Sequence, residues 1–252
     1  MQRYFIALAY NGTRYYGWQR QPGQATVQES LETAFSMILG ENIEFTGCGR
    51  TDAGVHALVY YAHFNTAKNL PEGLLHRINR VLGPDIAVNA IYPVHWDAHA
   101  RFDACYRSYA YHLTFRKDPF ACETAYYFPF RDRPLPGLMQ AAAAQLLLFD
   151  DFLSLCKTGH DAKTTLCTLF RSEWETDPAG ERMVYHIAAN RFLRGMVRLV
   201  VGMCIEVGLG KLSLEEVGQA LRRRERLRRN VSVPAGGLFL TDVRYPYALT
   251  PL

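Results

Sequence analysis

The sequence predicts an α+β fold made of two related domains, each a mixture of strands and helices. Residues 3–10 alternate as in a half-buried strand, and a capped helix pattern follows over 26–39. Strand and helix patterns then interleave along the chain, and a second tyrosine-rich alternating strand, 106–115, opens the later half as the first opens the earlier half. We therefore expect an N-terminal domain, 1–97, and a C-terminal domain, 98–252.

The elements of the first half are bounded by clear local signals. Thr26 and Glu29 form the capping-box pattern of a helix start, apolar residues keep helical spacing to Leu39, and Gly40 ends the helix. A proline opens a second predicted helix at 71–82, and the strand 86–92 follows. The stretches 43–48 and 58–64 read as strands on either side of a glycine-rich loop.

The second half repeats this mixture after an irregular stretch, 93–104, which we take as the domain junction. Hydrophobic periodicity distinguishes its strands from its helices. The predicted strands are 106–115, 169–176, 183–189 and 236–245, and the predicted helices are 138–148, 190–208 and 214–223.

Composition narrows the class of protein. The 252 residues are 49% hydrophobic, which is enough for a substantial core, and no apolar run approaches the roughly 20 residues that span a bilayer. The first residues lack the pattern of a signal peptide, so we expect a cytoplasmic protein without membrane contact. The six cysteines include no C-x-x-C pair, which predicts reduced, mostly buried thiols and no metal site.

Net charge is +4, a mild excess that favours polyanionic partners. Many arginines stand beside aromatic residues and glycines, and the run "RRRERLRR" places six of them between Arg222 and Arg229. Guanidinium groups bind phosphate and stack on bases, so nucleic acid is the expected partner. The run has two interpretations: a backbone-binding patch, or a solvated helix face on which Glu225 forms local ion pairs.

One loop concentrates the chemistry. In "TGCGRTDAGVHA" the glycines around Asp52 permit tight backbone conformations, so we expect Asp52 on a loop between two strands. An ordinary turn aspartate that bonds to its own backbone is the alternative. His56 ends this stretch, and we interpret it as a hydrogen-bonded loop residue.

The string "GRTDAGVHA" resembles the signature of the TruA-type tRNA pseudouridine synthases. Other landmarks similar to that family follow in order and cover nearly the whole chain: "YNGTRYYGWQRQ", "HARFDACYRSYAYHL", "NRFLRGMVRLVVG" and "PAGGLFLTDVRYP". The resemblance implies a duplicated ferredoxin-like unit with a basic cleft between the two domains. It also implies a cofactor-free isomerase that detaches uracil from its ribose, turns it, and rejoins it through carbon 5.

The resemblance also assigns roles to four residues. Asp52 would be the catalytic carboxylate, and its first act is left open: attack on the sugar, attack on the base, or removal of a sugar proton. Arg198 matches the family's basic partner, which would keep Asp52 ionised in a water-poor pocket. Tyr109 matches the tyrosine that stacks on the target base. Arg50 resembles the arginine that holds the flipped nucleotide, although a phosphate contact or a structural ion pair is the alternative.

Partners follow from the same resemblance. Family members are homodimers that bind tRNA across both subunits, and bacterial ones modify uridines 38, 39 and 40 of the anticodon arm. No metal or nucleotide cofactor is expected, because "HWDAH" lacks the glutamate of a zinc helix and "GLGKLS" lacks a phosphate-loop glycine. Two other function classes are the alternatives. One is an RNA chaperone that keeps the fold and the basic cleft but does not turn over a substrate. The other is a nucleoside hydrolase, which would need a second carboxylate near Asp52, and none is evident.

Overall fold

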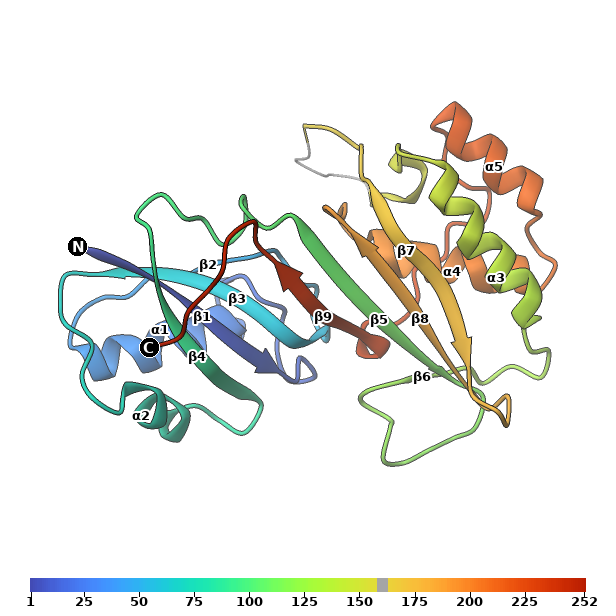
Figure 1. The fold of residues 1–252 in the computed structure, drawn as a ribbon. Helices are drawn as coiled ribbons and strands as arrows, with labels where there is room; N and C mark the ends of the chain where they lie inside the picture. The colour runs from blue at the N-terminus through green and yellow to red at the C-terminus, as the bar shows by residue number, and fades with distance from the viewer. Residues whose placement is uncertain (158–162) are drawn as a thin grey trace. The chain divides into compact units, whose positions relative to one another are not determined.

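The chain divides into two units, which are described separately below: residues 1–106 with 239–252, and residues 107–238. The computed structural model describes residues 1–157 and 163–252 (Figure 1). Both units combine sheet and helices, so the expected α+β class is confirmed at this level. Within the described residues no helix has the length and apolar character to cross a membrane.

The sheet of the first unit has the strand order β4-β1-β3-β9. Its bounds are Ile86–Val94 for β4, Gln2–Tyr10 for β1, His56–Thr66 for β3 and Leu238–Arg244 for β9. Strand β1 is antiparallel to both neighbours, whereas β9 pairs with β3 in parallel, with His56 opposite Phe239. The two-residue strand β2, Thr46–Gly47, pairs with the far part of β3.

Two helices accompany this sheet. Helix α1, Val27–Leu39, begins where the Thr26 hydroxyl accepts a hydrogen bond from the Glu29 amide (3.3 Å) and ends at Gly40, as predicted. Helix α2, Leu74–Val81, is shorter than the predicted 71–82. The two helices lie side by side (Figure 1), and their buried side chains complete one layer of the core.

The two faces of the sheet bury different chemistry, because side chains alternate along each strand. On the helical face, Phe64 of β3 packs edge-on against Phe35 of α1, with ring centroids 5.2 Å apart. On the other face, Phe5 stacks on His63 and lies against Ala98 and Ala100. The stretch 95–104 thus covers the second face and belongs to the packing of the first unit.

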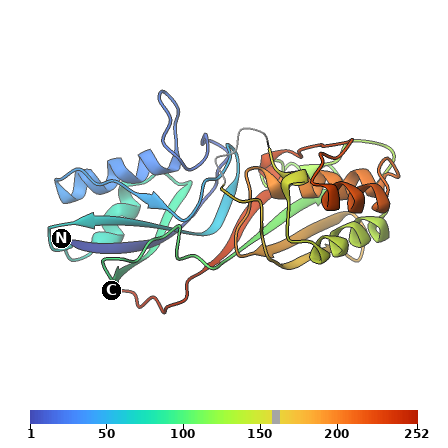
Figure 2. The same cartoon turned by 90° about the horizontal axis from the view of Figure 1, so that it is seen from above.

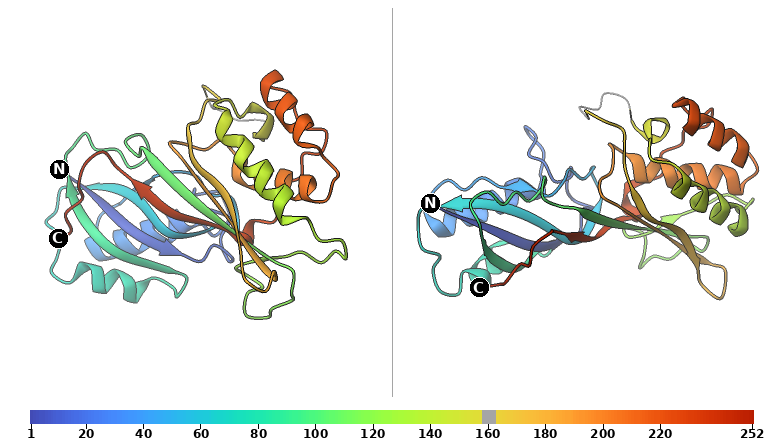
Figure 3. Two further views of the ribbon diagram at one scale, coloured as in Figure 1. Left: turned by 45° about the vertical axis from the view of Figure 1, so that its right-hand side comes forward. Right: turned by 45° about the horizontal axis from the view of Figure 1, so that its top comes forward.

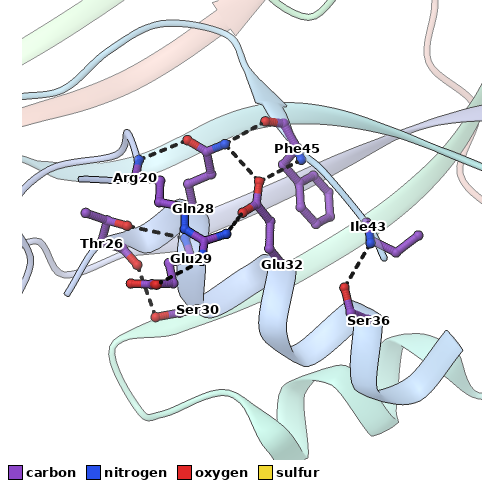
Figure 4. A network of polar contacts seen from close by, with 9 residues as sticks. All are labelled: Arg20, Thr26, Gln28, Glu29, Ser30, Glu32, Ser36, Ile43 and Phe45. Atoms are coloured by element: carbon purple, nitrogen blue, oxygen red, sulfur yellow. Dashed lines mark hydrogen bonds and ion pairs between the residues drawn. The ribbon is translucent and has the colours of Figure 1, made fainter. Parts of the chain in front are cut away.

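A buried polar network ties the start of α1 to the chain on both sides of it (Figure 4). The Glu32 carboxylate, 8% exposed, accepts hydrogen bonds from the Phe45 amide (3.0 Å) and from Gln28 Nε2 (2.8 Å), and pairs with Arg20 (3.4 Å). Gln28 Oε1 in turn accepts from the Arg20 amide (3.1 Å). Every polar atom that Glu32 buries here has a partner, which offsets the cost of removing its charge from water.

The second unit contains the antiparallel strands β5-β8-β7, in that order. Strand β5 spans Tyr106–Thr114, β7 Leu169–Thr176 and β8 Arg182–Ala189, and the short β6, Tyr126–Tyr127, pairs with β5. A buried hydroxyl links this sheet to the helix above it. Ser172 Oγ donates to the Ala143 carbonyl (2.7 Å), and its contact with the Tyr185 hydroxyl (2.7 Å) joins β7 to β8.

Helices gather on one face of this sheet (Figure 3). They are α3, Pro136–Gln145, α4, Met196–Gly208, and α5, Leu214–Arg223, with 3₁₀ turns at Leu146–Leu148, Leu153–Leu155 and Ala235–Gly237. Helix α4 begins six residues later than predicted, directly after Gly195, whose φ is 67°. Helix α5 has the predicted bounds and carries a complete capping box of Ser213 and Glu216.

The domain division at residue 97 stays a prediction. The two units change over near Tyr106, and the last strand, β9, belongs mostly with the first unit. Within the predicted junction, 93–104, Ala98 and Ala100 pack on β1 and β3. Packing, and not composition, assigns these residues to a unit.

Candidate active site

Asp52 lies on a loop, residues 48–55, that joins β2 to β3 in the first unit, as predicted. The loop is bonded to β3 at its start, where the Cys48 amide donates to the Tyr61 carbonyl (2.8 Å) and the Tyr60 hydroxyl donates to the Gly49 carbonyl. At its end the Val55 amide donates to the Asp52 carbonyl (3.2 Å), which closes a tight turn. Asp52 itself is half-buried. The carboxylate therefore sits on a loop fixed at both ends.

A second segment, residues 11–18 between β1 and α1, lies against this loop. The Gly54 amide donates to the Tyr15 carbonyl (3.2 Å), and the Trp18 amide donates to the Thr51 carbonyl (3.4 Å). The Tyr10 and Thr51 hydroxyls are 2.9 Å apart and share a hydrogen bond. Figure 2 shows the connection between β1 and α1, in dark blue, projecting from the first unit. We call residues 11–18 the brace.

The brace is the part of the site that the sequence prediction missed. The stretch "YNGTRYYGWQRQ" served only as a family landmark, although its two glycines, Gly12 and Gly17, were an available signal. A Cβ on Gly12 would lie 2.0 Å from the Val55 carbonyl oxygen, and one on Gly17, whose φ is 86°, would lie 2.2 Å from the Thr51 carbonyl oxygen. Side chains at these two positions would therefore push the brace off the Asp52 loop.

Arg50 precedes Asp52 by two residues and is exposed. Within the described residues its side chain makes no hydrogen bond or ion pair, so the structural-pair alternative for Arg50 has no support. A guanidinium that faces water beside a reactive loop suits contact with a substrate.

Tyr109 lies in β5 of the second unit, opposite Ile187 of β8. It is half-buried, and its ring meets the Phe192 ring edge-on, with centroids 5.1 Å apart. Edge-on packing of this kind holds the plane of the tyrosine ring in place. A ring that is fixed and partly accessible has the properties that base stacking needs.

Tyr111, two residues along β5, is a core tyrosine. It is fully buried, and its hydroxyl donates to the Pro234 carbonyl (2.8 Å). Burial raises the pKa of Tyr111, with a further rise from Tyr126 and an opposing effect of Arg198. The phenol is neutral throughout the physiological range.

Arg198 lies in the first turn of α4, and every other residue of that helix is buried. Its Nε donates to the Val233 carbonyl (2.7 Å), and the Val233 amide donates back to the Arg198 carbonyl (3.3 Å). Arg198 is thus partly buried and held by a backbone carbonyl within the second unit. Asp52 lies in the first unit and Arg198 in the second, and their ion pair stays a prediction.

The run Arg222–Arg229 is only partly helical, because α5 ends at Arg223 and Arg224 has a left-handed φ of 58°. Its arginines pair with acids distant in sequence: Arg224 with Asp151 (3.1 Å), Arg228 with Glu216 (3.3 Å), and Arg229 with the buried Glu206. The interpretation as a solvated helix face had Glu225 forming the local ion pairs, whereas these three arginines pair with other acids. Arg223 and Arg226 are exposed, and no hydrogen bond or ion pair is described for their side chains.

Cysteines and histidines add no metal-like cluster to the part of the chain that the structure describes. All six cysteines are free thiols and four are buried, as predicted. Burial raises the pKa of Cys167 to about 11 and of Cys204 to about 12, which makes both thiols unreactive. His99, considered as a ligand and set aside, accepts hydrogen bonds from the Arg101 and Phe102 amides at Nδ1 (3.1 and 3.2 Å).

Comparison with known proteins covers both units. A family model described as tRNA pseudouridine synthase matches residues 6–103 and 142–246. A protein of Parabacteroides distasonis named tRNA pseudouridine synthase A is 42% identical over an alignment of 259 positions, which covers 100% of this chain and 99% of that protein. Proteins of the same name from Bacteroides thetaiotaomicron and Chlorobaculum tepidum are 44% and 38% identical, over 98% and 95% of this chain and 91% and 96% of their own lengths.

Proposed function

This chain belongs to the tRNA pseudouridine synthase family, and we propose that Asp52 is the carboxylate with which it isomerises uridine to pseudouridine in tRNA. The chain is an isomerase, and the first matched segment of the family model, residues 6–103, contains Asp52. The observation that carries the assignment is the doubly anchored loop: a half-buried carboxylate, held between β2 and β3 and against the brace. Reactive groups need this kind of fixed position on a rigid scaffold.

The reaction needs no redox partner, because product and substrate are isomers. The bond between N1 and C1′ breaks, the bond between C5 and C1′ forms, C5 loses its proton and N1 gains one. An ionised Asp52 suffices for each of the three possible first acts: attack on C1′, attack on C6 of the base, or removal of a proton from the sugar. All three require the carboxylate to be charged when the uridine arrives.

Arg198 is the group that we assign to keep Asp52 charged. A carboxylate in a water-poor pocket takes up a proton unless a cation lies nearby. The bond from Arg198 Nε to Val233 fixes the direction of the guanidinium, and α4 is so fully buried that the arginine has little freedom to leave. The helix and the Val233 carbonyl together hold the positive charge of Arg198 in a fixed position before the substrate binds.

Tyr109 and Arg50 are assigned to the flipped nucleotide. Stacking on an aromatic ring stabilises a base by about 1 to 3 kcal/mol, comparable with the few kcal/mol lost when the base leaves its helical stack. Stacking on Tyr109 therefore offsets the energy lost when the base leaves the helix, but it does not by itself drive the base out. Arg50, exposed on the Asp52 loop itself, supplies a second contact in the space that the base leaves.

The substrate is tRNA, and we place the target uridines at positions 38, 39 and 40 of the anticodon arm. Both units would be related ferredoxin-like domains, with a basic cleft between them that binds the RNA backbone. We also propose a cytoplasmic homodimer that binds tRNA across both subunits. The exposed guanidinium groups of Arg50, Arg223 and Arg226 support an RNA partner.

The test is to incubate the purified protein with unmodified tRNA and to map pseudouridine by mass spectrometry. We expect conversion at positions 38 to 40 and none with Asp52→Asn, which keeps the size of the side chain but removes its charge. Folding and tRNA binding should be retained by the variant. Turnover by Asp52→Asn would overturn the catalytic assignment, and tRNA binding without conversion by the parent protein would point to an RNA chaperone.

A further inference from the structure

His56 closes the Asp52 loop in a way that its sequence position does not reveal. It is the first residue of β3, only 2% exposed, four positions after Asp52. Its Nδ1 accepts a hydrogen bond from the Gly12 amide (3.1 Å), the first glycine of the brace. One side chain therefore joins the end of the catalytic loop to the brace.

The geometry fixes the state of the imidazole. An Nδ1 that accepts from an amide carries no proton, so the neutral ring has its proton on Nε2. The ring also stacks on Phe239 of β9, with centroids 4.4 Å apart and planes 19° from parallel. The stack fixes the ring plane, and the ring plane aims Nδ1 at Gly12.

The backbone of the brace lies so close to the Asp52 loop that neither Gly12 nor Gly17 has room for a side chain. The Val55 carbonyl oxygen occupies the space where a side chain at Gly12 would begin, and the Thr51 carbonyl does the same at Gly17. These two contacts lie on either side of Asp52 in the sequence. A small displacement of the brace is therefore transmitted directly to the backbone that carries the carboxylate.

We propose that His56 is a positioning residue for the isomerisation: by accepting from Gly12 it seats the brace, and the seated brace holds Asp52 in its reactive place. The inference rests on the proposed role of Asp52. The role that we assign to His56 is positional and needs no proton transfer: its Nδ1 accepts from the Gly12 amide, and its ring is buried.

Two substitutions separate the two properties of the ring. His56→Phe keeps an aromatic ring for the stack on Phe239 and removes the acceptor. His56→Asn removes the ring and keeps an acceptor at the position of Nδ1. The measurements are the single-turnover rate at saturating tRNA, the KM and the affinity for tRNA, with thermal unfolding as a check on folding.

We expect His56→Phe to lower the single-turnover rate by about ten- to a hundredfold, because a misplacement of about 1 Å has an effect of that size. The KM and tRNA affinity should change less than about twofold, since Asp52 acts in chemistry and not in backbone binding. His56→Asn should recover most of the rate. A histidine that transferred protons would not be rescued by asparagine, which does not titrate.

A normal rate in His56→Phe, or an equal loss in both variants, would overturn the proposal. A change confined to KM would do the same. If His56→Phe does not fold, Tyr10→Phe tests the support of the same loop at the end of β1, directly before the brace, since it removes the bond to the Thr51 hydroxyl (2.9 Å) and should lower the rate in the same direction. Asp52→Asn keeps the two hypotheses apart: turnover by that variant contradicts the role of Asp52, whereas full activity of His56→Phe contradicts only the role of His56.

Discussion

Tyr111 and Arg198 donate hydrogen bonds to consecutive carbonyl oxygens, Tyr111 to Pro234 (2.8 Å) and Arg198 to Val233 (2.7 Å). One stretch of backbone thus fixes a buried tyrosine of β5 and the partly buried arginine of α4. Gly202 lets that backbone come close, because a Cβ there would lie 1.9 Å from the Val231 carbonyl oxygen. The position of Arg198 is therefore tied to the core through residues 231–234.

Tyr111→Phe should destabilise the protein by about 1 kcal/mol, because it leaves the Pro234 carbonyl without its buried donor. The free energy of unfolding in urea measures this loss. Tyr127→Phe, an exposed tyrosine, is the matched control and should unfold as the parent does. Equal stability of Tyr111→Phe and the parent would show that the bond to Pro234 contributes nothing.

Arg198→Met should move the acid limb of the single-turnover rate to higher pH, because the positive charge that we propose beside Asp52 is lost. Arg198→Lys should recover activity only in part, since an ammonium restores the charge but not the forked geometry. The measurement is rate against pH with tRNA saturating. A normal rate and an unshifted acid limb in Arg198→Met would remove the main support for an active site shared by the two units.

The double change Arg223→Gln with Arg226→Gln should weaken tRNA binding and reduce the slope of log affinity against log salt by about 1 to 2. The rate of saturated enzyme should stay near that of the parent. Arg224→Gln serves as the control, because that guanidinium already pairs with Asp151. An unchanged slope in the double variant would assign this stretch to the surface packing of α5 alone.

The lowered pKa of His63 predicts that the free energy of unfolding decreases in acid. Burial lowers the pKa of His63 from 6.5 to about 4, with smaller contributions from Arg3 and His99, and Asp103 opposes the shift. Between these two values the unfolded chain binds a proton that the folded chain does not, so stability rises with pH through this window. The effect is up to roughly 3 kcal/mol, full above pH 6.5 and lost as the pH falls toward 4.

The measurement for His63 is the free energy of unfolding at several pH values. His63→Asn keeps an acceptor for the Ala100 amide, which now donates to His63 Nδ1 (3.1 Å), and removes the titrating group. Its unfolding free energy should vary less steeply between pH 6.5 and 4 than that of the parent. Parallel curves for the two proteins would contradict the assignment.

Local signals predicted elements whose ends are set locally. Helix α1 has the predicted end at Leu39, and β7 and α5 have the predicted bounds, because caps and alternation are properties of neighbouring residues. Helix α4 was predicted too long because residues 190–195 share its apolar spacing, although Gly195 in the left-handed region stops it. Periodicity alone does not register such a break.

Contacts between residues far apart in the chain could not be predicted from the sequence. Nothing local indicates that Glu206 and Arg229 pair, or that the brace lies on the Asp52 loop through Gly12 and His56. The Asp52 motif could be recognised because its residue types and spacing are unusual. The contact of the brace with this loop could not be predicted, because it is made by backbone amides and by the absence of side chains.

The parallel pairing of β9 with β3 sets the order in which the first unit is completed during synthesis. His56 needs Phe239 for its stack, and about 170 residues separate the end of β3 at Thr66 from the start of β9 at Leu238. At ribosomal speeds of about 5 to 20 residues per second, this interval lasts roughly 10 to 30 seconds. The nascent chain thus carries the Asp52 loop for that time without the strand that completes its support, and a prematurely terminated product retains the catalytic motif but not the assembled sheet.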